Sequence, residues 1–494
     1  MIKIKQLLLA PLCICLLLPL SNAEAQRLDE VQYYGAIDFS QQLRTWDGFG
    51  VNYVQSARSV DYSAYAQDYG GFKYLTPKQR DDITDLIFGE DGLQPDLIKM
   101  FLDPLHYDAK TKSYDHKITT EYMRYFTKRG IELSAKRNQD ISIITTLYGP
   151  PPQATLQNSF NGRDLDFSQK DFLADYLTDW LRFLKQENLP IKYISLFNEA
   201  DKPHGWATEG TVSAENIFDY NTYWSPPQVA EFMPFLRKKM DNSQLKDVGI
   251  TPGECSSWQN FNHRLYDFTI ANNPQALSAL SLVTCHSFGG SNLAIPDGVR
   301  FLRKYKPELH AWVTSSSWGR NDLYMPGQII LNINHVKVNA YIPWAIIQTP
   351  TQWYQAADPN AAPPIRVNEN GTYEVTPIYT YYKHFTRAGH AGMAISPVVT
   401  STESGIGLVA FETNDTKYPD AFVVLNSNDF TSKTIAIKID GSKTNSYQAR
   451  RTWMKYGLKV MEEYKDLGQF KLENGYIIYT CPPHSVTTFW AKER

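Results

Sequence analysis

Eight short apolar runs, separated by longer amphipathic stretches, occupy the chain from residue 46 to residue 346. Apolar runs of four to eight residues bounded by turn residues are typical of strands buried on both faces of a parallel sheet. Eight strand-and-helix units in succession predict an α/β fold of the (β/α)8 TIM-barrel type. The runs are 46–54, 96–103, 140–149, 191–199, 247–254, 280–288, 310–316 and 338–346.

The stretches between the runs carry helical periodicity. In segment 171–188, apolar side chains recur at spacings of three and four residues, as in Leu173, Tyr176, Leu177 and Trp180. This spacing places them on one face of a helix. The same pattern predicts a helix over residues 122–137.

The hydrophobic pattern of the sequence changes near residue 389. Apolar and polar residues then alternate with a period of two, and turn residues separate the segments. This pattern predicts a barrel over residues 46–388 followed by an antiparallel β-sandwich over 389–494. Segment 26–45 is too short to form a domain, so we expect it to add strands to the sandwich.

The first 25 residues resemble a targeting segment. Lys3 and Lys5 precede the apolar run 7–20, and the small residues of SNAEA follow it. A charged region, a short apolar region and a small-residue cleavage site indicate a secretory signal peptide. We therefore expect signal peptide cleavage after Ala25 and a secreted or periplasmic protein. The run is short for a membrane span, and no other segment resembles one, so membrane insertion is not expected.

The composition narrows the classes of partner. The formal net charge of the 494-residue chain is −3, so no basic surface for nucleic acid is expected. The histidines are scattered without a pair four residues apart, and no glycine-rich phosphate loop is present, so neither a metal nor another cofactor is expected. Aromatic residues make up 13% of the chain, which suits stacking on sugar rings, although large barrels also use them in their cores. We expect a monomer.

Three cysteines lie outside the predicted signal peptide: Cys255, Cys285 and Cys481. A chain of this size does not need disulfides to be stable, so buried free thiols are expected. A bridge between Cys255 and Cys285 is the alternative, because both lie near predicted strand ends.

The fourth apolar run ends in the sequence SLFNEA, which places Asn198 and Glu199 at a carboxyl end of the predicted barrel. Active sites of TIM barrels lie at these ends. A glycosidase needs a carboxylic acid beside the glycosidic oxygen, and a neighbouring amide can hold a sugar hydroxyl. Glu199 is therefore the candidate general acid/base. The alternative is a helix N-cap or a surface glutamate.

Several short motifs in this order resemble glycoside hydrolase family 30, which belongs to a clan of retaining TIM-barrel glycosidases. The motifs are WDGFG at 46–50, YGPPPQ at 148–153, LFNEA at 196–200, NAYIPWAIIQTP at 339–350 and PPHSVTTFWA at 482–491. The family includes glucosylceramidases, β-1,6-glucanases, β-1,6-galactanases and xylanases. The resemblance implies an oligo- or polysaccharide substrate with β-linkages, with β-1,6-galactan or β-1,6-glucan favoured. Glu199 matches the family's acid/base, Asn198 the preceding amide, and Trp344 the aromatic residue that ends strand eight.

The family's nucleophile has no counterpart at the expected place. Strand seven of the family ends in a nucleophilic glutamate, and in HAWVTSSSWG (310–319) this position falls on Ser315 or a near neighbour. No acidic residue lies between Glu308 and Asp322. A retaining glycosidase needs a carboxylate about 5 Å from the acid, and an unactivated hydroxyl is a poor nucleophile. A serine therefore cannot simply replace the glutamate.

Four interpretations remain open. Another carboxylate can activate a water in an inverting arrangement, with Glu254 as the best candidate and Asp103 and Asp322 as weaker ones. The protein can instead bind glycan without cleaving it, or it can be a nucleophile-replaced variant that traps substrate. Finally, the alignment of strand seven can be out of register.

The remaining candidate residues have a structural and a functional interpretation each. Glu254 is either catalytic or a partner of Lys99 or His286. Lys99, if buried, needs a carboxylate nearby, which we expect to be Glu199 or Glu254. Lys99 and His286 are predicted to contact substrate, although His286 can instead be a hydrogen-bonded wall residue. One or two of five aromatic residues are expected to stack a sugar ring: Tyr148, Trp206, Trp258, Trp318 and Trp344.

Overall fold

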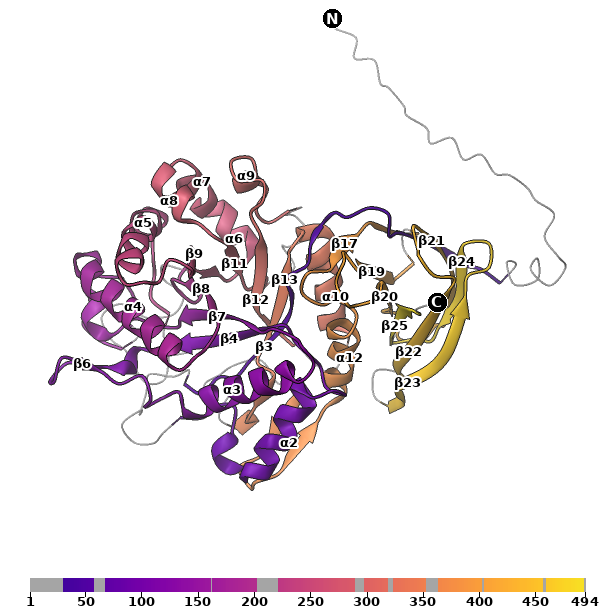
Figure 1. Cartoon of the computed structure of the whole chain (residues 1–494), viewed down its shortest axis with the longest axis horizontal. Coiled ribbons are helices and arrows are strands. Elements are labelled where there is room, and N and C mark those ends of the chain that lie inside the picture. The colour runs from indigo at the N-terminus through magenta and orange to yellow at the C-terminus, as the bar shows by residue number, and fades with distance from the viewer. Residues whose placement is uncertain are drawn as a thin grey trace, which may run out of the picture.

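The computed structural model describes residues 30–56, 67–160, 162–201, 221–288, 297–318, 323–351, 363–401, 404–455 and 459–492. Two parts are visible in Figure 1, a barrel surrounded by helices and a smaller β-sandwich formed mainly by the C-terminal strands. The predicted signal peptide lies outside the described residues.

All eight predicted apolar runs form strands of one parallel sheet, with the fifth run divided into two pieces. The order in the sheet is β10-β11-β12-β13-β3-β4-β7-β8-β9. The sheet order begins with β10 and ends with β9, and these are the two pieces of the fifth run. Isolated bridges at Ile250–Leu280 and Asn198–Glu254 join them to the neighbouring strands, so the sheet closes into a barrel. The predicted TIM barrel is confirmed. Its strands are β3 (Gly48–Asn52), β4 (Leu97–Leu102), β7 (Ser142–Leu147), β8 (Ile191–Ser195), β9 (Gly249–Thr251), β10 (Glu254–Cys255), β11 (Val283–Cys285), β12 (Ala311–Ser317) and β13 (Ala340–Trp344).

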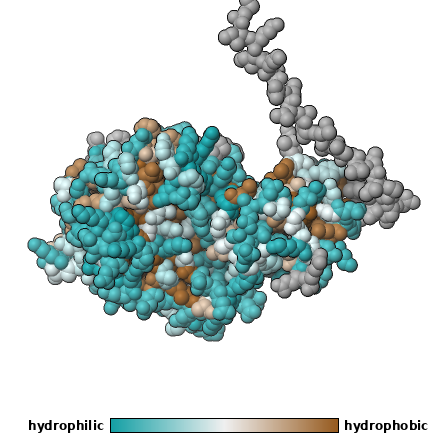
Figure 2. Space-filling model, turned by 45° about the horizontal axis from the view of Figure 1, so that its top comes forward, coloured by the Kyte–Doolittle hydropathy of each residue, from teal (hydrophilic) through white to brown (hydrophobic). Residues whose placement is uncertain are grey.

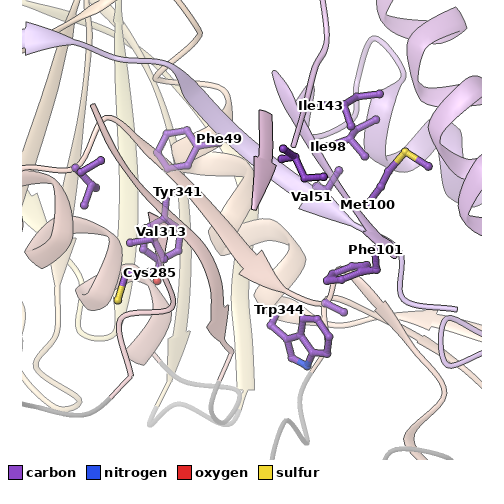
Figure 3. Packing of buried hydrophobic residues seen from close by; sticks show 14 of the residues in the cluster. Phe49, Val51, Ile98, Met100, Phe101, Ile143, Cys285, Val313, Tyr341 and Trp344 are labelled. Atoms are coloured by element: carbon purple, nitrogen blue, oxygen red, sulfur yellow. The ribbon is translucent and has the colours of Figure 1, made fainter. Parts of the chain in front are cut away.

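Two apolar clusters hold the barrel together. A small cluster that includes Leu97, Ile144, Leu282 and Trp312 gathers residues from strands on all sides of the barrel. A much larger cluster packs the outer faces of the strands against the helices, and Figure 3 shows some of its members. Full burial of one large apolar side chain contributes about 1.5–3 kcal/mol. The barrel is thus a packed scaffold rather than a pore.

Helices cover the outside of the barrel (Figure 1). The helices predicted at 122–137 and 171–188 are α3 (Glu121–Ala135) and α4 (Lys170–Gln186), and α4 buries the predicted face that includes Trp180. The other helices are α2 (Pro77–Phe88), α5 (Pro226–Asn242), α6 (Trp258–His263), α7 (Tyr266–Ala271), α8 (Pro274–Ala279), α9 (Arg300–Arg303), α10 (Tyr324–Leu331) and α12 (Pro377–Thr386). Short 3-10 or π turns are η1 (Phe72–Tyr74), η2 (Pro104–His106), η3 (Pro152–Ala154), η4 (Phe167–Gln169) and η6 (Asn332–Val336). No helix of the described segments is both long and apolar enough to cross a membrane.

The sandwich consists of a four-stranded sheet, β18-β1-β21-β24, and a seven-stranded sheet, β2-β17-β19-β20-β25-β22-β23. Segment 26–45 supplies one strand to each sheet: β1 pairs in parallel with β21, and β2 pairs with β17. The strands are β1 (Tyr33–Asp38), β2 (Arg44–Thr45), β17 (Ala394–Ser396), β18 (Val398–Thr400), β19 (Ile406–Glu412), β20 (Ala421–Asn426), β21 (Lys433–Asp440), β22 (Ser446–Lys455), β23 (Lys459–Lys471), β24 (Tyr476–Cys481) and β25 (Ser485–Ala491). Smaller sheets are formed by β5 (Tyr107–Asp108) with β6 (Ser113–Tyr114), and by β14 (Ile347–Gln348), β15 (Ile365–Val367) and β16 (Tyr373–Val375).

The sandwich packs against the barrel through α12, which contacts both (Figure 1). The Tyr382 hydroxyl of α12 donates to the carbonyl of Gly50 in β3 at 2.7 Å. On the other side, the indole of Trp490 in β25 donates to the Arg387 carbonyl at the end of α12, also at 2.7 Å. Figure 2 shows the sandwich as a smaller lobe beside the barrel, with hydrophilic and apolar residues interspersed on this face.

The three described cysteines are buried free thiols, as expected. Cys255 and Cys285 lie opposite each other on the adjacent strands β10 and β11. They do not form the alternative disulfide. Instead, the Cys285 thiol donates to the Cys255 carbonyl at 3.0 Å.

Candidate active site

The backbone of Glu199 is fixed at the carboxyl end of β8. Its amide donates to the Glu254 carbonyl at 2.7 Å, and the Glu254 amide donates to the Phe197 carbonyl at 2.9 Å. Glu199 has a φ of 47°, in the left-handed region that residues other than glycine rarely adopt. Strained backbone of this kind persists where its surroundings hold it in place, and it clusters at functional sites.

A chain of buried charged groups starts from the Glu199 side chain. His286 Nδ1 lies 2.7 Å from Glu199 Oε1, and His286 Nε2 lies 2.8 Å from Glu254 Oε2. Lys99 Nζ lies 2.5 Å from the same oxygen of Glu254. The hydroxyl of Thr146 donates to Glu254 Oε1 at 2.6 Å. Five strand regions of the barrel therefore meet in one network.

The network shifts the pKa values of Glu254, His286 and Lys99. Burial alone would raise the pKa of Glu254, but the positive charges of Lys99 and His286 outweigh it and lower this pKa to about 2. Burial acts to lower the pKa of His286, yet its hydrogen bonds to Glu199 and Glu254 raise it above 6.5. Burial lowers the pKa of Lys99, and the charge of Glu254 opposes that effect. The imidazole, when charged, donates to both carboxylates.

These contacts give structural partners to Lys99 and His286, two of the residues predicted to bind substrate. The Lys99 side chain is fully buried against Glu254, one of the two carboxylate partners that we expected. Both nitrogens of His286 face carboxylates, which leaves neither for a sugar hydroxyl. Glu254 is also fully buried, and both of its oxygens accept hydrogen bonds. It offers no exposed oxygen to activate a water.

Asn198 lies next to Glu199 with unused hydrogen-bonding capacity. Its Nδ2 donates to Asn221 Oδ1 at 2.9 Å. Its own Oδ1 and the Nδ2 of Asn221 are buried without a hydrogen-bond partner among the described residues. A buried amide left in this state costs free energy unless another group satisfies it. A sugar hydroxyl can do so, because it both donates and accepts.

Asp201, two residues after Glu199, is bound to the segment that follows β10. Its carboxylate accepts hydrogen bonds from the Ser256 amide at 3.0 Å, the Ser256 hydroxyl at 2.9 Å and Asn260 Nδ2 at 2.7 Å. Burial raises its pKa. Neither this role of Asp201 nor that of Thr146 was predicted from the sequence, although Thr146 lies within the third apolar run and Asp201 follows the fourth.

Three aromatic rings cluster at the carboxyl ends of β4, β7 and β13. The rings of Tyr148 and Trp344 stack with centroids 6.1 Å apart, and the Phe101 ring meets both edge-on at 5.5 and 5.6 Å. Figure 3 shows Phe101 beside Trp344. Trp344 keeps 7% of its surface exposed, against 2% for Tyr148. Trp344 is thus the better placed of the two to present a ring to a ligand.

The other aromatic predictions have different outcomes. Trp318, which was also predicted to bind substrate, is fully buried: its indole donates to the Ala345 carbonyl at 2.9 Å, and it packs edge-on against Tyr382. Trp258 is also fully buried in the core. Trp206 lies outside the described residues.

Ser315 lies at the carboxyl end of β12, inside a β-bulge. Val313 pairs with Tyr341, but Ser316 pairs with Pro343, so Thr314 and Ser315 together oppose the single residue Ile342. Bulges often re-aim side chains next to active sites. Ser315 is 2% exposed, and the neighbouring Thr314 hydroxyl is buried without a partner among the described residues.

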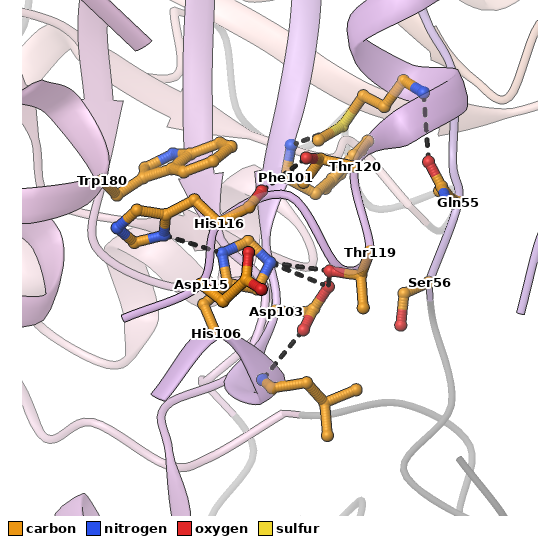
Figure 4. Close-up of polar contacts among 12 residues, drawn as sticks. Gln55, Ser56, Phe101, Asp103, His106, Asp115, His116, Thr119, Thr120 and Trp180 are labelled. Atoms are coloured by element: carbon orange, nitrogen blue, oxygen red, sulfur yellow. Dashed lines mark hydrogen bonds and ion pairs between the residues drawn. The ribbon is translucent and has the colours of Figure 1, made fainter. Parts of the chain in front are cut away.

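Asp103, a weaker catalytic candidate, has a structural role. It accepts hydrogen bonds from the Thr119 hydroxyl at 2.5 Å and the Leu105 amide at 2.9 Å. His106 Nε2 lies 2.7 Å from the same hydroxyl, and a further contact links His106 to His116 (Figure 4). These contacts tie the loop after β4 to the segment before α3. Asp322, the other weaker candidate, lies outside the described residues.

No group of three or more histidine, cysteine, aspartate or glutamate side chains that could hold a metal ion occurs within the described segments. The charged network instead joins two carboxylates through one imidazole. Such an arrangement can hold a carboxylate in a fixed orientation, as acid–base chemistry requires.

No protein-family model matches the sequence, and no curated protein matches it. Solved structures do match over nearly the whole chain. A GH30 endoxylanase from Clostridium papyrosolvens is 14% identical with a TM-score of 0.67, covering 93% of this chain and 100% of its own. The endo-beta1,6-glucanase BT3312 is 16% identical with a TM-score of 0.67, covering 93% of this chain and 94% of its own. A conserved exported protein from Bacteroides fragilis is 12% identical with a TM-score of 0.72, covering 92% and 99%.

At these identities the likeness establishes architecture, because barrels of one fold support many different chemistries. The resemblance noted in the sequence is thus matched by three-dimensional structure over both the barrel and the sandwich. The chain has a fold like that of glycoside hydrolase family 30.

Proposed function

We propose that the protein is a secreted or periplasmic glycoside hydrolase that acts on a β-linked glycan, with Glu199 as the general acid/base. The observation that carries this proposal is the buried Lys99–Glu254–His286 chain that ends on the Glu199 carboxylate. Buried charges cost free energy unless each one is paired. Here the paired charges hold the Glu199 side chain in one orientation. The fold shared with GH30 xylanases and an endo-beta1,6-glucanase supports the substrate class.

In this proposal Glu254 is a positioning residue rather than the catalytic base predicted as one alternative. It keeps His286 charged, and His286 orients Glu199. Asn198 holds a sugar hydroxyl with its unpaired amide oxygen, and Trp344 offers a ring face. The substrates we favour are β-1,6-glucan and β-1,6-galactan.

A second function is favoured by one observation, the serine at position 315. If no carboxylate serves as nucleophile or base, the same site binds the glycan without cleaving it. Loss of a catalytic carboxylate lowers the cleavage rate on the order of 10³-fold or more. The cleavage rate therefore distinguishes a hydrolase from a protein that only binds the glycan.

The test is an assay of the purified protein and a Ser315→Glu variant on β-1,6-glucan, β-1,6-galactan, xylan and aryl β-glycosides. Released sugar is quantified, and the anomer formed first is followed by NMR. Cleavage by the unmodified protein supports the hydrolase, and an inverted product indicates a remote base. Cleavage by the Ser315→Glu variant alone supports the silent glycan-binding protein. If neither protein releases sugar from any of these glycans, and calorimetric titration shows no binding of them, both functions are wrong.

A further inference from the structure

A second cavity, of about 310 Å³, lies between the barrel and the sandwich. One wall comes from the loop between α2 and β4 (Asp91 and Gln94) and from α12 and the residues after it, and the other from the sandwich strands β22, β23 and β25. The loop before β4 lies at the amino end of the strands, whereas Glu199 follows the carboxyl end of β8. The cavity is therefore distinct from the candidate active site.

Three cations surround this cavity: Lys383, Arg387 and Arg450. Main-chain carbonyls hold two of them in place. Lys383 Nζ donates to the Asp91 carbonyl, and Arg387 Nη1 donates to the Glu90 carbonyl at 2.7 Å. Among the described residues, no carboxylate lies within ion-pair distance of any of the three. They are positioned without forming an ion pair.

The surroundings of Lys383 shift its pKa. Burial, together with repulsion from Arg387 and Arg450, lowers its pKa to about 8, although Asp91 and Glu463 act in the opposite direction. A bound anion would relieve that repulsion. The three cations outnumber Asp91, the one carboxylate among the lining residues, so the net positive charge of the cavity attracts an anion.

Aromatic side chains complete the cavity: Tyr418, Tyr464 and Trp490. Lys383 Nζ lies 4.7 Å from the centroid of the Tyr464 ring, and the Arg450 guanidinium lies 5.1 Å from it. Tyr464 has a φ of 45° and sits where the pairing of β22 with β23 shifts register. Irregularities of this kind change the direction of a side chain relative to a regular strand, and they are common next to binding sites.

We propose that this cavity binds the carboxylate-bearing ring of an acidic sugar. The cations bind the carboxylate, since charge-assisted hydrogen bonds to guanidinium and ammonium groups are the strong ones. The aromatic side chains pack against the apolar face of the ring. A cavity of this volume lies at the lower end of the range typical of small-ligand sites, which suits one sugar ring.

The test is calorimetric titration of the whole protein with methyl β-D-glucuronide, methyl β-D-glucoside and sodium sulfate. The two glycosides differ only at C6, which is a carboxylate in the glucuronide and a hydroxymethyl group in the glucoside. We expect the glucuronide to bind at least about tenfold more tightly than the glucoside, a difference of about 1.4 kcal/mol. Binding of the glucoside with equal affinity, or of sulfate as tightly as the glucuronide, would overturn the proposal.

Two variants test whether the glucuronide binds in this cavity, and a third controls for the loss of a positive charge. Arg450→Gln and Tyr464→Leu are each expected to weaken glucuronide binding at least about fivefold. Lys471→Gln removes the same charge from an exposed position on β23 and is expected to change nothing. Thermal unfolding confirms that each variant is folded. Unchanged glucuronide binding in a folded Arg450→Gln variant would contradict the proposal.

A Glu199→Gln variant separates this site from the proposed function. It is expected to bind glucuronide normally whether or not the protein cleaves glycans. Loss of glucuronide binding in this variant would place the acidic sugar in the candidate active site and overturn the assignment to the second cavity.

Discussion

His286 Nδ1 lies 2.7 Å from Glu199 Oε1, so the candidate acid is held by an imidazole whose other nitrogen faces a second, fully buried carboxylate. This contact joins two strand ends that are 87 residues apart in the sequence. It makes the orientation of Glu199 depend on groups that a substrate does not reach.

The first prediction concerns Glu254. Glu254→Gln removes the charge that pairs with Lys99 and leaves a buried ammonium without compensation. Breaking a buried ion pair in this way costs about 3–5 kcal/mol. Chemical denaturation should show a loss in the free energy of unfolding of this size. The matched change at an exposed position, Glu308→Gln, should cost less than about 0.5 kcal/mol. Equal stability of the two variants would rule out the charged network.

The second prediction is a pH dependence of stability. The folded pKa of Glu254, about 2, lies below its ordinary 4.5, so its contribution is present above pH 4.5 and is lost as the pH falls toward 2. The folded pKa of His286 is raised above 6.5, so its contribution is complete below pH 6.5 and is lost as the pH rises through the folded value.

A His286→Asn variant isolates the second of these effects. The stability difference between the unmodified protein and this variant should be largest near pH 6 and should shrink toward pH 9. Urea denaturation at several pH values measures it. A difference that stays constant over this range would mean that His286 does not gain a proton on folding.

The third prediction separates two tryptophans that look alike in sequence. Trp344→Leu should weaken glycan binding by about fivefold, since one aromatic packing interaction contributes about 0.5–1.5 kcal/mol. Trp318→Leu should instead destabilise the fold, because Trp318 fills the core and its indole is hydrogen-bonded. Glycan affinity and the unfolding temperature of both variants are the readouts. A reversal of the two phenotypes would contradict the placement of these rings.

The fourth prediction concerns the thiols. Burial raises the pKa of Cys255, Cys285 and Cys481, which keeps them protonated and unreactive. In the chain from residue 26 onward, a thiol reagent should modify none of the three in the native state and all three after unfolding. Recovery of a single thiol under denaturing, non-reducing conditions would reveal a disulfide and contradict the structure.

The barrel could be predicted from the sequence because its strands are buried on both faces. Such strands read as continuous apolar runs, and the sequence alone locates all eight. Strand β23 could not be located in this way, because most of its side chains are exposed and no apolar alternation marks it. The division of the fifth run into β9 and β10 was also not predicted, since it depends on contacts with neighbouring strands.

Parts of the candidate site were predictable for a similar reason. Strand ends identified Glu199, Asn198, Glu254 and His286, and the burial of Lys99 implied a carboxylate partner. Sequence position could not show that His286 bridges two glutamates, because this depends on the closure of the barrel. It also could not distinguish Trp318, whose ring points into the core, from Trp344 at the barrel mouth.

The most direct test of the central claim is the rate of glycan cleavage by a Glu199→Gln variant, measured on whichever glycan of the panel the unmodified protein cleaves. Gln keeps the shape of the side chain but cannot donate or accept the proton. We expect a loss in kcat of about 10²–10⁴-fold with glycan affinity and stability retained. A Glu199→Gln variant that cleaves the glycan at the unmodified rate would show that Glu199 is not the acid.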